Sequence, residues 1–91
     1  MLILQKNKSF SVALAHIKSG GKAKRSNWNG QDQYIYVSNR VTIQDSDGNE
    51  IVAENGCFGS QVIVFVNPKL GYQVGWLASQ GDMLAEDWVL L

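Results

Sequence analysis

Cysteine, histidine and proline each occur only once in the 91 residues, and this scarcity excludes several kinds of protein. The single cysteine, Cys57, has no partner for an internal disulfide, and it fits a reducing compartment. One histidine and one cysteine cannot supply a metal cluster with the usual ligand spacing, so we expect neither a metal nor a cofactor. The histidine, His16, lies off the apolar stripe of its segment and is expected at the surface.

Long apolar runs are lacking as well. The longest, residues 62–66, is far too short to span a bilayer, so no membrane partner is expected. Residues 1–4 are apolar but are followed at once by polar and basic residues, an order that does not match a signal peptide. The apolar fraction of 45% is ordinary for a globular protein, and the length fits a single domain over residues 1–91.

Charge is balanced overall but unevenly distributed. Eight basic and eight acidic residues give a net charge of zero. Residues 1–25 contain basic residues and no acid, whereas every acid lies at Asp32 or later. Proteins that coat DNA or RNA carry a surplus of positive charge, so the balance argues against a nucleic-acid partner. The basic segment can still bind one small anion, or it can be a solvated face without a specific partner.

The first element of the expected fold is a helix. Ser9 can cap it, and Gly20-Gly21 can end it in a left-handed conformation, so we expect the helix over residues 9–19. Four apolar residues recur at helical spacing and form one stripe: Phe10, Ala13, Leu14 and Ile17.

After Gly21 the apolar period changes to two, which predicts short strands. Ser79 then begins a short helix that runs to about Ala85, and residues 45–49 form the Asp-Gly turn of a hairpin. The fold class is therefore α+β: an N-terminal helix packed on an antiparallel β-sheet, with a short second helix near the C-terminus. The expected strands are residues 22–26, 33–38, 40–44, 50–54, 62–66, 72–77 and 88–91.

Catalytic machinery is hard to find, so we expect a binding protein and not an enzyme. Residues 56–59 lack the length and context of a phosphate-binding loop. Asp82 and Asp87 are five residues apart, and on a continuous helix they would point to different sides.

Three segments carry residues suited to binding. In residues 22–30, a basic strand ends at Trp28. The Trp28 ring can stack on a base, a contact worth about 1–3 kcal/mol, or it can fill the core. In residues 76–88, Ser79 and Asp82 can form a capping box at the start of a helix. The free N–H groups there can bind an anion, or the segment is simply a well-capped structural helix. Residues 33–37 place two tyrosines on one face, for stacking bases or for a subunit interface.

Taken together, these segments resemble the phage Thoeris anti-defence proteins of the second type, a family of small nucleotide sponges. Members have an amphipathic helix with Phe, Ala and Leu, a Gly-Lys turn and a basic strand that ends in Trp-Asn-Gly. Here Gly21-Lys22 and Trp28-Asn29-Gly30 match, and residues 76–88 match the C-terminal string of Trp, Ser-Gln, Asp-Met-Leu-Ala and Asp-Trp. The chain departs from the family at Asn27, where members often have Gly, and over residues 45–60, which here form a compact hairpin.

The resemblance implies a function. Such proteins bind and sequester cyclic ADP-ribose isomers made by TIR-domain enzymes, without cleaving them, in the cytoplasm of the bacterial host. Some also hold cyclic dinucleotides at a separate site, and they assemble as homo-oligomers, usually tetramers, with pockets at subunit contacts. The candidate ligand-binding residues are Lys22, Arg25, Trp28, Asn29, Gln80, Asp82 and Met83.

The roles within that set follow from chemistry. Trp28 is expected to stack on the base, and Asn29, Gln80 and Asp82 to contact ribose hydroxyls. Lys22 or Arg25 would face the pyrophosphate, which a carboxylate repels.

Two other functions remain open at this stage. One is a structural or partner-binding phage protein with the same fold and no ligand, and the other is a binder of single-stranded nucleic acid that uses Tyr34 and Tyr36. An oligomer is expected both for the nucleotide sponge and for the structural protein, because one helix cannot hide all the aromatic surface. The aromatic residues concerned are Tyr34, Tyr36, Phe58, Phe65 and Tyr72.

Overall fold

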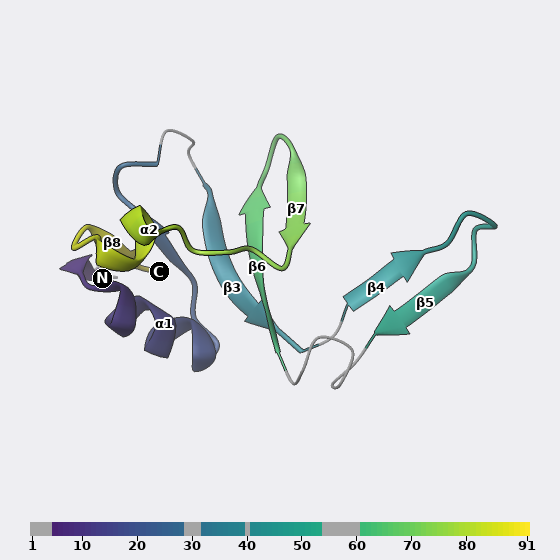
Figure 1. Ribbon diagram of the computed structural model, residues 1–91, viewed down its shortest axis with the longest axis horizontal. Coiled ribbons are helices and arrows are strands. Elements are labelled where there is room, and N and C mark those ends of the chain that lie inside the picture. Colours follow the sequence, from purple (N-terminus) through teal and green to yellow (C-terminus); the bar gives the residue numbers. More distant parts are fainter. Residues whose placement is uncertain (1–4, 29–31, 40, 54–60) are drawn as a thin grey trace.

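A computed structural model describes residues 5–28, 32–39, 41–53 and 61–91 (Figure 1). The described residues form two helices, α1 (Phe10–Lys18) and α2 (Gln80–Leu84), and the strands of two sheets. Six strands form one antiparallel sheet in the order β1-β8-β2-β3-β6-β7, and β4 and β5 pair as a separate hairpin. The predicted α+β class is confirmed. The strands are β1 (Gln5–Lys8), β2 (Ala23–Arg25), β3 (Tyr34–Ser38), β4 (Val41–Gln44), β5 (Glu50–Ala53), β6 (Val62–Asn67), β7 (Gly71–Val74) and β8 (Trp88–Leu90).

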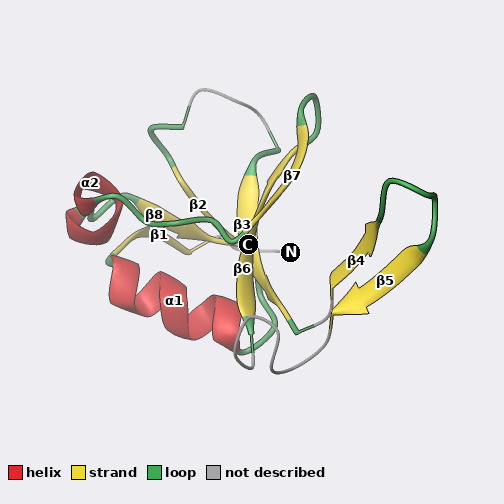
Figure 2. Cartoon of the chain, turned by 45° about the vertical axis from the view of Figure 1, so that its right-hand side comes forward, coloured by secondary structure: helices red, strands yellow, loops and turns green. Residues whose placement is uncertain are grey.

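Helix α1 forms for the reasons that the sequence supplies. The Ser9 side chain accepts a hydrogen bond from the Val12 N–H at 3.3 Å, which caps the first turn. Gly20, with φ of +101°, ends the helix in the left-handed region that favours glycine. The apolar stripe packs on one face of the six-stranded sheet, where it buries Ala13 and Ile17 (Figure 2).

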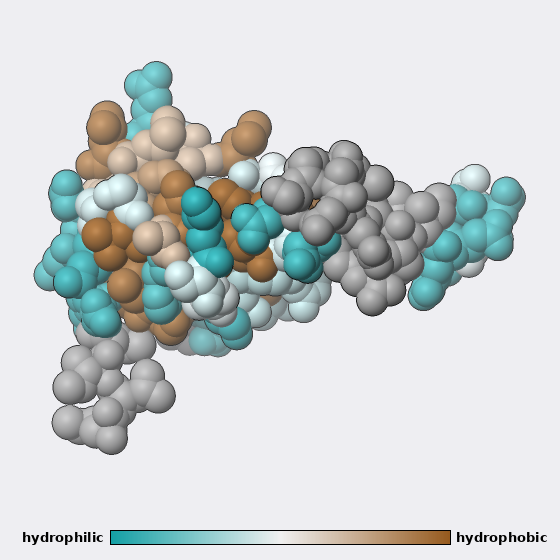
Figure 3. Space-filling model, turned by 90° about the horizontal axis from the view of Figure 1, so that it is seen from below, coloured by the Kyte–Doolittle hydropathy of each residue, from teal (hydrophilic) through white to brown (hydrophobic). Residues whose placement is uncertain are grey.

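The hydrophobic core lies between α1 and the middle of that sheet. Because side chains alternate along a strand, one residue in two points toward the helix. Apolar residues gather in patches over the sheet and helices, whereas the tip of the β4–β5 hairpin is hydrophilic (Figure 3). The buried core cluster consists of Ala13, Ile17, Ala23, Ile35, Trp88 and Leu90.

The opposite face of the sheet, which we call the open face, is not packed on α1. Tyr34 and Tyr36 lie there, with ring centroids 6.1 Å apart, while Ile35 between them is fully buried on the α1 side. Pairing of Tyr34 with Val66, and of Val66 with Tyr72, places Tyr72 on the same face. Its side chain is 70% exposed.

Phe65 was expected among the aromatic residues that one helix cannot cover, and its position differs from that expectation. It alternates with Val66 along β6, so it lies on the α1 side and packs against the core. The open face therefore presents tyrosines but not Phe65, and Phe58 lies outside the described residues.

Strands β1 and β7 differ from what the sequence predicts. β1 was not expected, because two of its four residues are lysines, yet it pairs with β8 as an edge strand, where lysines are common. β7 ends at Val74, three residues before the predicted end. Gly75 has φ of +81°, and the N–H groups of Gly75 and Trp76 both turn back to the Ile63 carbonyl, at 3.0 and 2.9 Å.

His16 is not the plain surface residue that the sequence suggests. Its side chain is half-buried, and its Nε2 lies 2.9 Å from the carbonyl oxygen of Leu91. Gly21 packs so closely on the imidazole that any Cβ there would overlap the ring. The ring thus connects the end of α1 to the residue that follows β8.

In the parts of the chain that are described, no helix has the length and hydrophobicity that crossing a membrane requires.

Candidate functional site

Arg25, at the end of β2, joins two acids from the C-terminal segment. Its Nη1 lies 2.9 Å from Asp82 Oδ1 and its Nε lies 3.0 Å from Asp87 Oδ1. The three side chains are largely shielded, with exposed fractions of 17% for Arg25, 14% for Asp82 and 26% for Asp87. We call these three residues the Arg25 cluster.

The cluster corrects the expectation that Asp82 and Asp87 point to different sides. That geometry applies only to a continuous helix, and α2 ends at Leu84. Ala85 has extended backbone angles, φ of −70° and ψ of 149°, so the chain turns before Asp87. Both carboxylates therefore reach one guanidinium.

The second oxygen of each carboxylate holds a neighbouring segment in place. Asp82 Oδ2 accepts the Ser79 N–H at 3.0 Å, and Ser79 Oγ accepts the Asp82 N–H at 3.0 Å, which confirms the predicted capping box. Asp87 Oδ2 accepts the Asn27 N–H at 3.2 Å. The cluster thus links α2 to the segment that leads into Trp28.

Electrostatics keep all three members charged near neutral pH. Hydrogen bonds to Asp87 and Asp82 raise the pKa of Arg25. Burial alone would raise the pKa of Asp82, but hydrogen bonds from Ser79 and Arg25 outweigh it and lower the pKa. Burial would likewise raise the pKa of Asp87, but the hydrogen bond and positive charge of Arg25, together with the Asn27 N–H, outweigh it and lower the pKa.

Trp28 lies beside this cluster, in a group of rings that we call the tryptophan cluster: Trp28, Phe65, Trp76 and Trp88. Its ring centroid is 5.3 Å from that of Phe65, 5.5 Å from that of Trp88 and 6.2 Å from that of Trp76, all in edge-to-face contact. The indole Nε1 of Trp88 donates to the Asp82 carbonyl at 2.9 Å, which joins the two clusters. Trp28 is half-buried, so it packs against the core and still keeps exposed surface. Its role in stacking stays a prediction.

The structure brings together only part of the predicted binding set. Arg25, Trp28 and Asp82 lie near one another, and α2 also carries Gln80 and the half-exposed Met83. Asn29 lies outside the described residues. Asp87 was missed as a site residue, although the family-like string of residues 76–88 includes it.

Lys22 lies apart from that group. It precedes β2, in which Ala23 and Arg25 face α1 and the C-terminal segment, and alternation places Lys22 and Lys24 on the open face. The Lys22 Nζ lies 4.6 Å from the centroid of the Tyr34 ring. Within one chain, the structure therefore does not unite Lys22 with Trp28.

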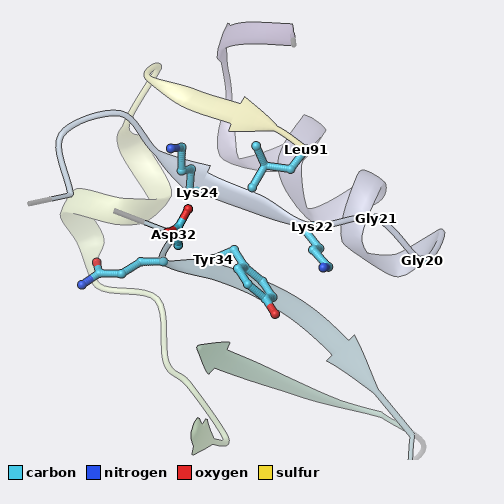
Figure 4. Close-up of a pocket in the computed structure, with 8 residues that line it drawn as sticks. Gly20, Gly21, Lys22, Lys24, Asp32, Tyr34 and Leu91 are labelled. Atoms are coloured by element: carbon cyan, nitrogen blue, oxygen red, sulfur yellow. The ribbon is translucent and has the colours of Figure 1, made fainter. Parts of the chain in front are cut away.

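Lys22 and Lys24 line a cavity of about 510 Å³ (Figure 4). The other residues that line the cavity, which we call the lysine pocket, are Gly20, Gly21, Asp32, Gln33, Tyr34 and Leu91.

Among the described residues, no group of three or more His, Cys, Asp or Glu side chains could hold a metal ion.

Comparisons with known proteins cover almost the whole chain. A family model described as the Thoeris anti-defense 2-like domain matches residues 8–91. The protein Thoeris anti-defense 2 of Bacillus phage SP01 is 32% identical over 83 residues, which cover 88% of this chain and 90% of that protein. The matched family span includes both clusters and the lysine pocket.

Proposed function

The chain belongs to the Thoeris anti-defense 2-like family, which implies that it counteracts Thoeris defence, and we propose that it does so by binding a nucleotide signal. The proposed ligand is a cyclic ADP-ribose isomer produced by a TIR-domain enzyme in the cytoplasm of the bacterial host. The protein holds this ligand without cleaving it, so it lowers the concentration of free signal. Sequestration of this kind needs affinity and a sufficient number of sites, but no general acid or base.

The observation that carries the proposal is the contact between the tryptophan cluster and the Arg25 cluster. Trp28 offers a rigid aromatic surface whose orientation is fixed by three other rings. Asp82, fixed by Arg25 and Ser79, offers a charged acceptor for ribose hydroxyls nearby. A preorganised aromatic face beside a preorganised carboxylate suits a nucleoside, because little side-chain entropy remains to be lost on binding.

The other members of the predicted set take their roles from their positions. Gln80 and Met83 belong to α2, the same helix that Asp82 caps, and they contact the sugar and the edge of the base. Because Lys22 and Arg25 lie on opposite faces of β2, Arg25 and not Lys22 is on the side of Trp28 in the same chain, with its Nη1 and Nε already paired to Asp82 and Asp87. Lys22 would reach a ligand held against Trp28 only from a second copy.

We also propose that the protein forms a homo-oligomer, with a tetramer as the expected state. The support is the number of large apolar side chains that lie exposed among the described residues and that contact between copies would bury. Tyr72 is 70% exposed on the open face, and Leu77 and Leu84 are 86% and 79% exposed near α2. Light scattering at micromolar concentration tests this, and a monomer would contradict it.

One experiment separates a sponge from an enzyme. The protein is incubated with cyclic ADP-ribose isomers, the complex is isolated by gel filtration, and the ligand is released by heat and identified by mass spectrometry. We expect the intact cyclic molecule in an amount that matches the protein sites. A linear product, or no ligand carried through gel filtration, would refute the proposal.

A matched pair of variants locates the site. Trp28→Phe keeps an aromatic ring in the cluster but reduces the stacking surface, so we expect the affinity to fall about tenfold while the fold is kept. Lys69→Gln changes one exposed side chain in the β6–β7 turn, on which no part of the proposed site depends. Equal affinities for the two variants would remove Trp28 from the site.

A further inference from the structure

We propose that Asp87 is a positioning residue of the proposed nucleotide site: it holds the turn at residues 25–28 and so determines where the Trp28 ring stands for a base to stack on. The inference rests on the proposed function, because it takes Trp28 as the stacking surface. It goes further by giving a role in ligand binding to a residue that does not itself touch the ligand. Its basis is a set of hydrogen bonds from one residue to three consecutive residues.

Trp28 follows a tight turn that begins at the end of β2. The N–H of Trp28 donates to the carbonyl of Arg25 at 3.2 Å, which closes a four-residue turn. The two central residues, Ser26 and Asn27, have exposed side chains, so packing contributes little to holding them. The position of Trp28 relative to the sheet therefore depends on the hydrogen bonds that the turn makes with other segments.

Asp87, which precedes β8, supplies those hydrogen bonds. Its carbonyl oxygen accepts the Ser26 N–H at 3.0 Å, and its Oδ2 accepts the Asn27 N–H at 3.2 Å. Oδ2 also accepts the Ser26 hydroxyl at 3.4 Å, and Oδ1 accepts the Arg25 Nε–H at 3.0 Å. Asp87 thus bonds to each of the three residues that lead into Trp28.

These bonds commit the Asp87 carboxylate to the protein and not to a ligand. Three donors already reach its two oxygens, and the side chain is only 26% exposed. The Arg25 guanidinium also neutralises its charge at close range. A carboxylate occupied in this way supports the groups of a site from behind, which is the role that keeps a binding surface rigid.

The residue after Asp87 holds the same tryptophan by its ring. Trp88 is fully buried, and its ring centroid lies 5.5 Å from that of Trp28 in edge-to-face contact. Such contacts tolerate small shifts, since centroid separations of about 4.5–7 Å are all favourable. N–H···O bonds are more restrictive, because they weaken steeply away from their preferred geometry. The ring contacts therefore limit which surface Trp28 presents, and the Asp87 bonds fix where its backbone stands.

Accurate placement matters because stacking requires close contact. The groups of a binding site need to lie within about 0.5 Å of their productive positions. Without the Asp87 side chain, the Asn27 N–H loses its acceptor and the turn is free to move, so the Trp28 ring samples several positions. Ligand binding then has to restore one of them, and that ordering cost weakens the affinity.

Calorimetric titration of the full chain with cyclic ADP-ribose measures the effect. Asp87→Ala removes the side-chain acceptor, and we expect the affinity to fall about tenfold, within what base stacking contributes. Asp87→Asn keeps an amide oxygen for the Asn27 N–H, so its affinity should stay within about threefold of wild type. His16→Ala is the matched control: it removes a side-chain hydrogen bond to Leu91, at the opposite end of β8, and should leave the affinity unchanged.

A double-mutant cycle on affinity shows whether Asp87 acts through Trp28. Trp28→Leu keeps an apolar side chain against the core and removes the stacking ring. In that background Asp87→Ala should cause no further loss of affinity, because no ring is left to position. Losses that multiply in the double variant would show that Asp87 affects the ligand independently of Trp28 and would overturn the inference. An Asp87→Ala affinity equal to that of His16→Ala would overturn it as well.

Near-ultraviolet circular dichroism, recorded well below the Tm of each variant, follows the rings without any ligand. The three tryptophans of the chain have ring centroids 5.5 to 6.5 Å apart, so their signal depends on how they are placed. We expect Asp87→Ala to weaken this signal, and Asp87→Asn and His16→Ala to keep it. An unchanged signal in Asp87→Ala would refute the positioning role. A wild-type protein that binds no cyclic ADP-ribose would instead refute the proposed function, and the dichroism would still decide whether Asp87 holds Trp28.

Discussion

Removal of the Arg25 guanidinium is the perturbation that most directly tests how the candidate site is held together. Arg25→Met keeps the aliphatic stem but abolishes the hydrogen bonds at 2.9 and 3.0 Å to Asp82 and Asp87. A hydrogen bond to a charged group contributes about 1.5–3 kcal/mol, and the two carboxylates are left largely shielded without their cation. We expect the free energy of unfolding to fall by about 3 kcal/mol, which lowers Tm by roughly 12–24 °C.

A double-mutant cycle distinguishes a true cluster from a general loss of packing. Asp87→Asn alone should cost about 1.5 kcal/mol, because one ion pair is lost while the amide oxygen can still accept from Asn27. The double variant Arg25→Met, Asp87→Asn should cost about 1–2 kcal/mol less than the sum, since it leaves only one carboxylate uncompensated.

Urea unfolding followed by tryptophan fluorescence measures all of these values. Lys24→Met is the matched control: it makes a similar change one residue away, at a position with no ion pair among the described residues. We expect it to change stability by less than about 0.5 kcal/mol. Additive costs in the cycle, or an Arg25→Met cost as small as that of Lys24→Met, would refute the reasoning.

Three further predictions concern the stability of the fold around the candidate site. Trp28→Ala should destabilise the fold by about 2–3 kcal/mol in thermal melting. This is less than the cost of removing a fully buried tryptophan, because the Trp28 ring is only half-buried. An unchanged Tm would show that its ring contacts contribute nothing. Gly21→Ala should turn the His16 ring away from the Leu91 carbonyl and cost about 1 kcal/mol, with no further loss when His16→Ala is added. The pKa values of Asp82 and Asp87 are lowered in the folded state, so their contribution to stability should be fully present above the ordinary carboxyl pKa of about 4 and should be lost as the pH drops below it. A pH scan of Tm that is flat from pH 5 to about 2 would contradict this.

Local rules predicted most of the fold because each element carries its own signals. Ser9 and Gly20 mark the ends of α1, Ser79 caps α2, and the Asp-Gly turn closes the β4–β5 hairpin. β1 escaped prediction because all four of its residues are polar or charged and show no apolar alternation, and only its pairing with β8 makes it a strand. Such pairing is a long-range contact, which no local pattern records.

The candidate site was predicted less completely, for a related reason. The sequence leaves open whether the Trp28 ring stacks on a base or fills the core. It does not show that Phe65 of β6 and Trp76, which follows β7, pack against that ring. It shows two acids five residues apart, but not that the chain turns at Ala85. A side chain's partners depend on where distant segments meet, so the residue types of the site were readable and their contacts were not.

Alternation along the short strand β2 explains why neighbouring cations face different surfaces. Alternation directs Arg25 toward the C-terminal segment and places Lys22 and Lys24 on the open face, so neighbouring cations serve different surfaces. A shift of β2 by one residue against β8 would exchange these faces, bury a lysine in place of Ala23 and break both ion pairs of Arg25. Burial of an unpaired lysine is strongly unfavourable, so the core itself fixes the register that keeps Arg25 apart from Lys22 and Lys24.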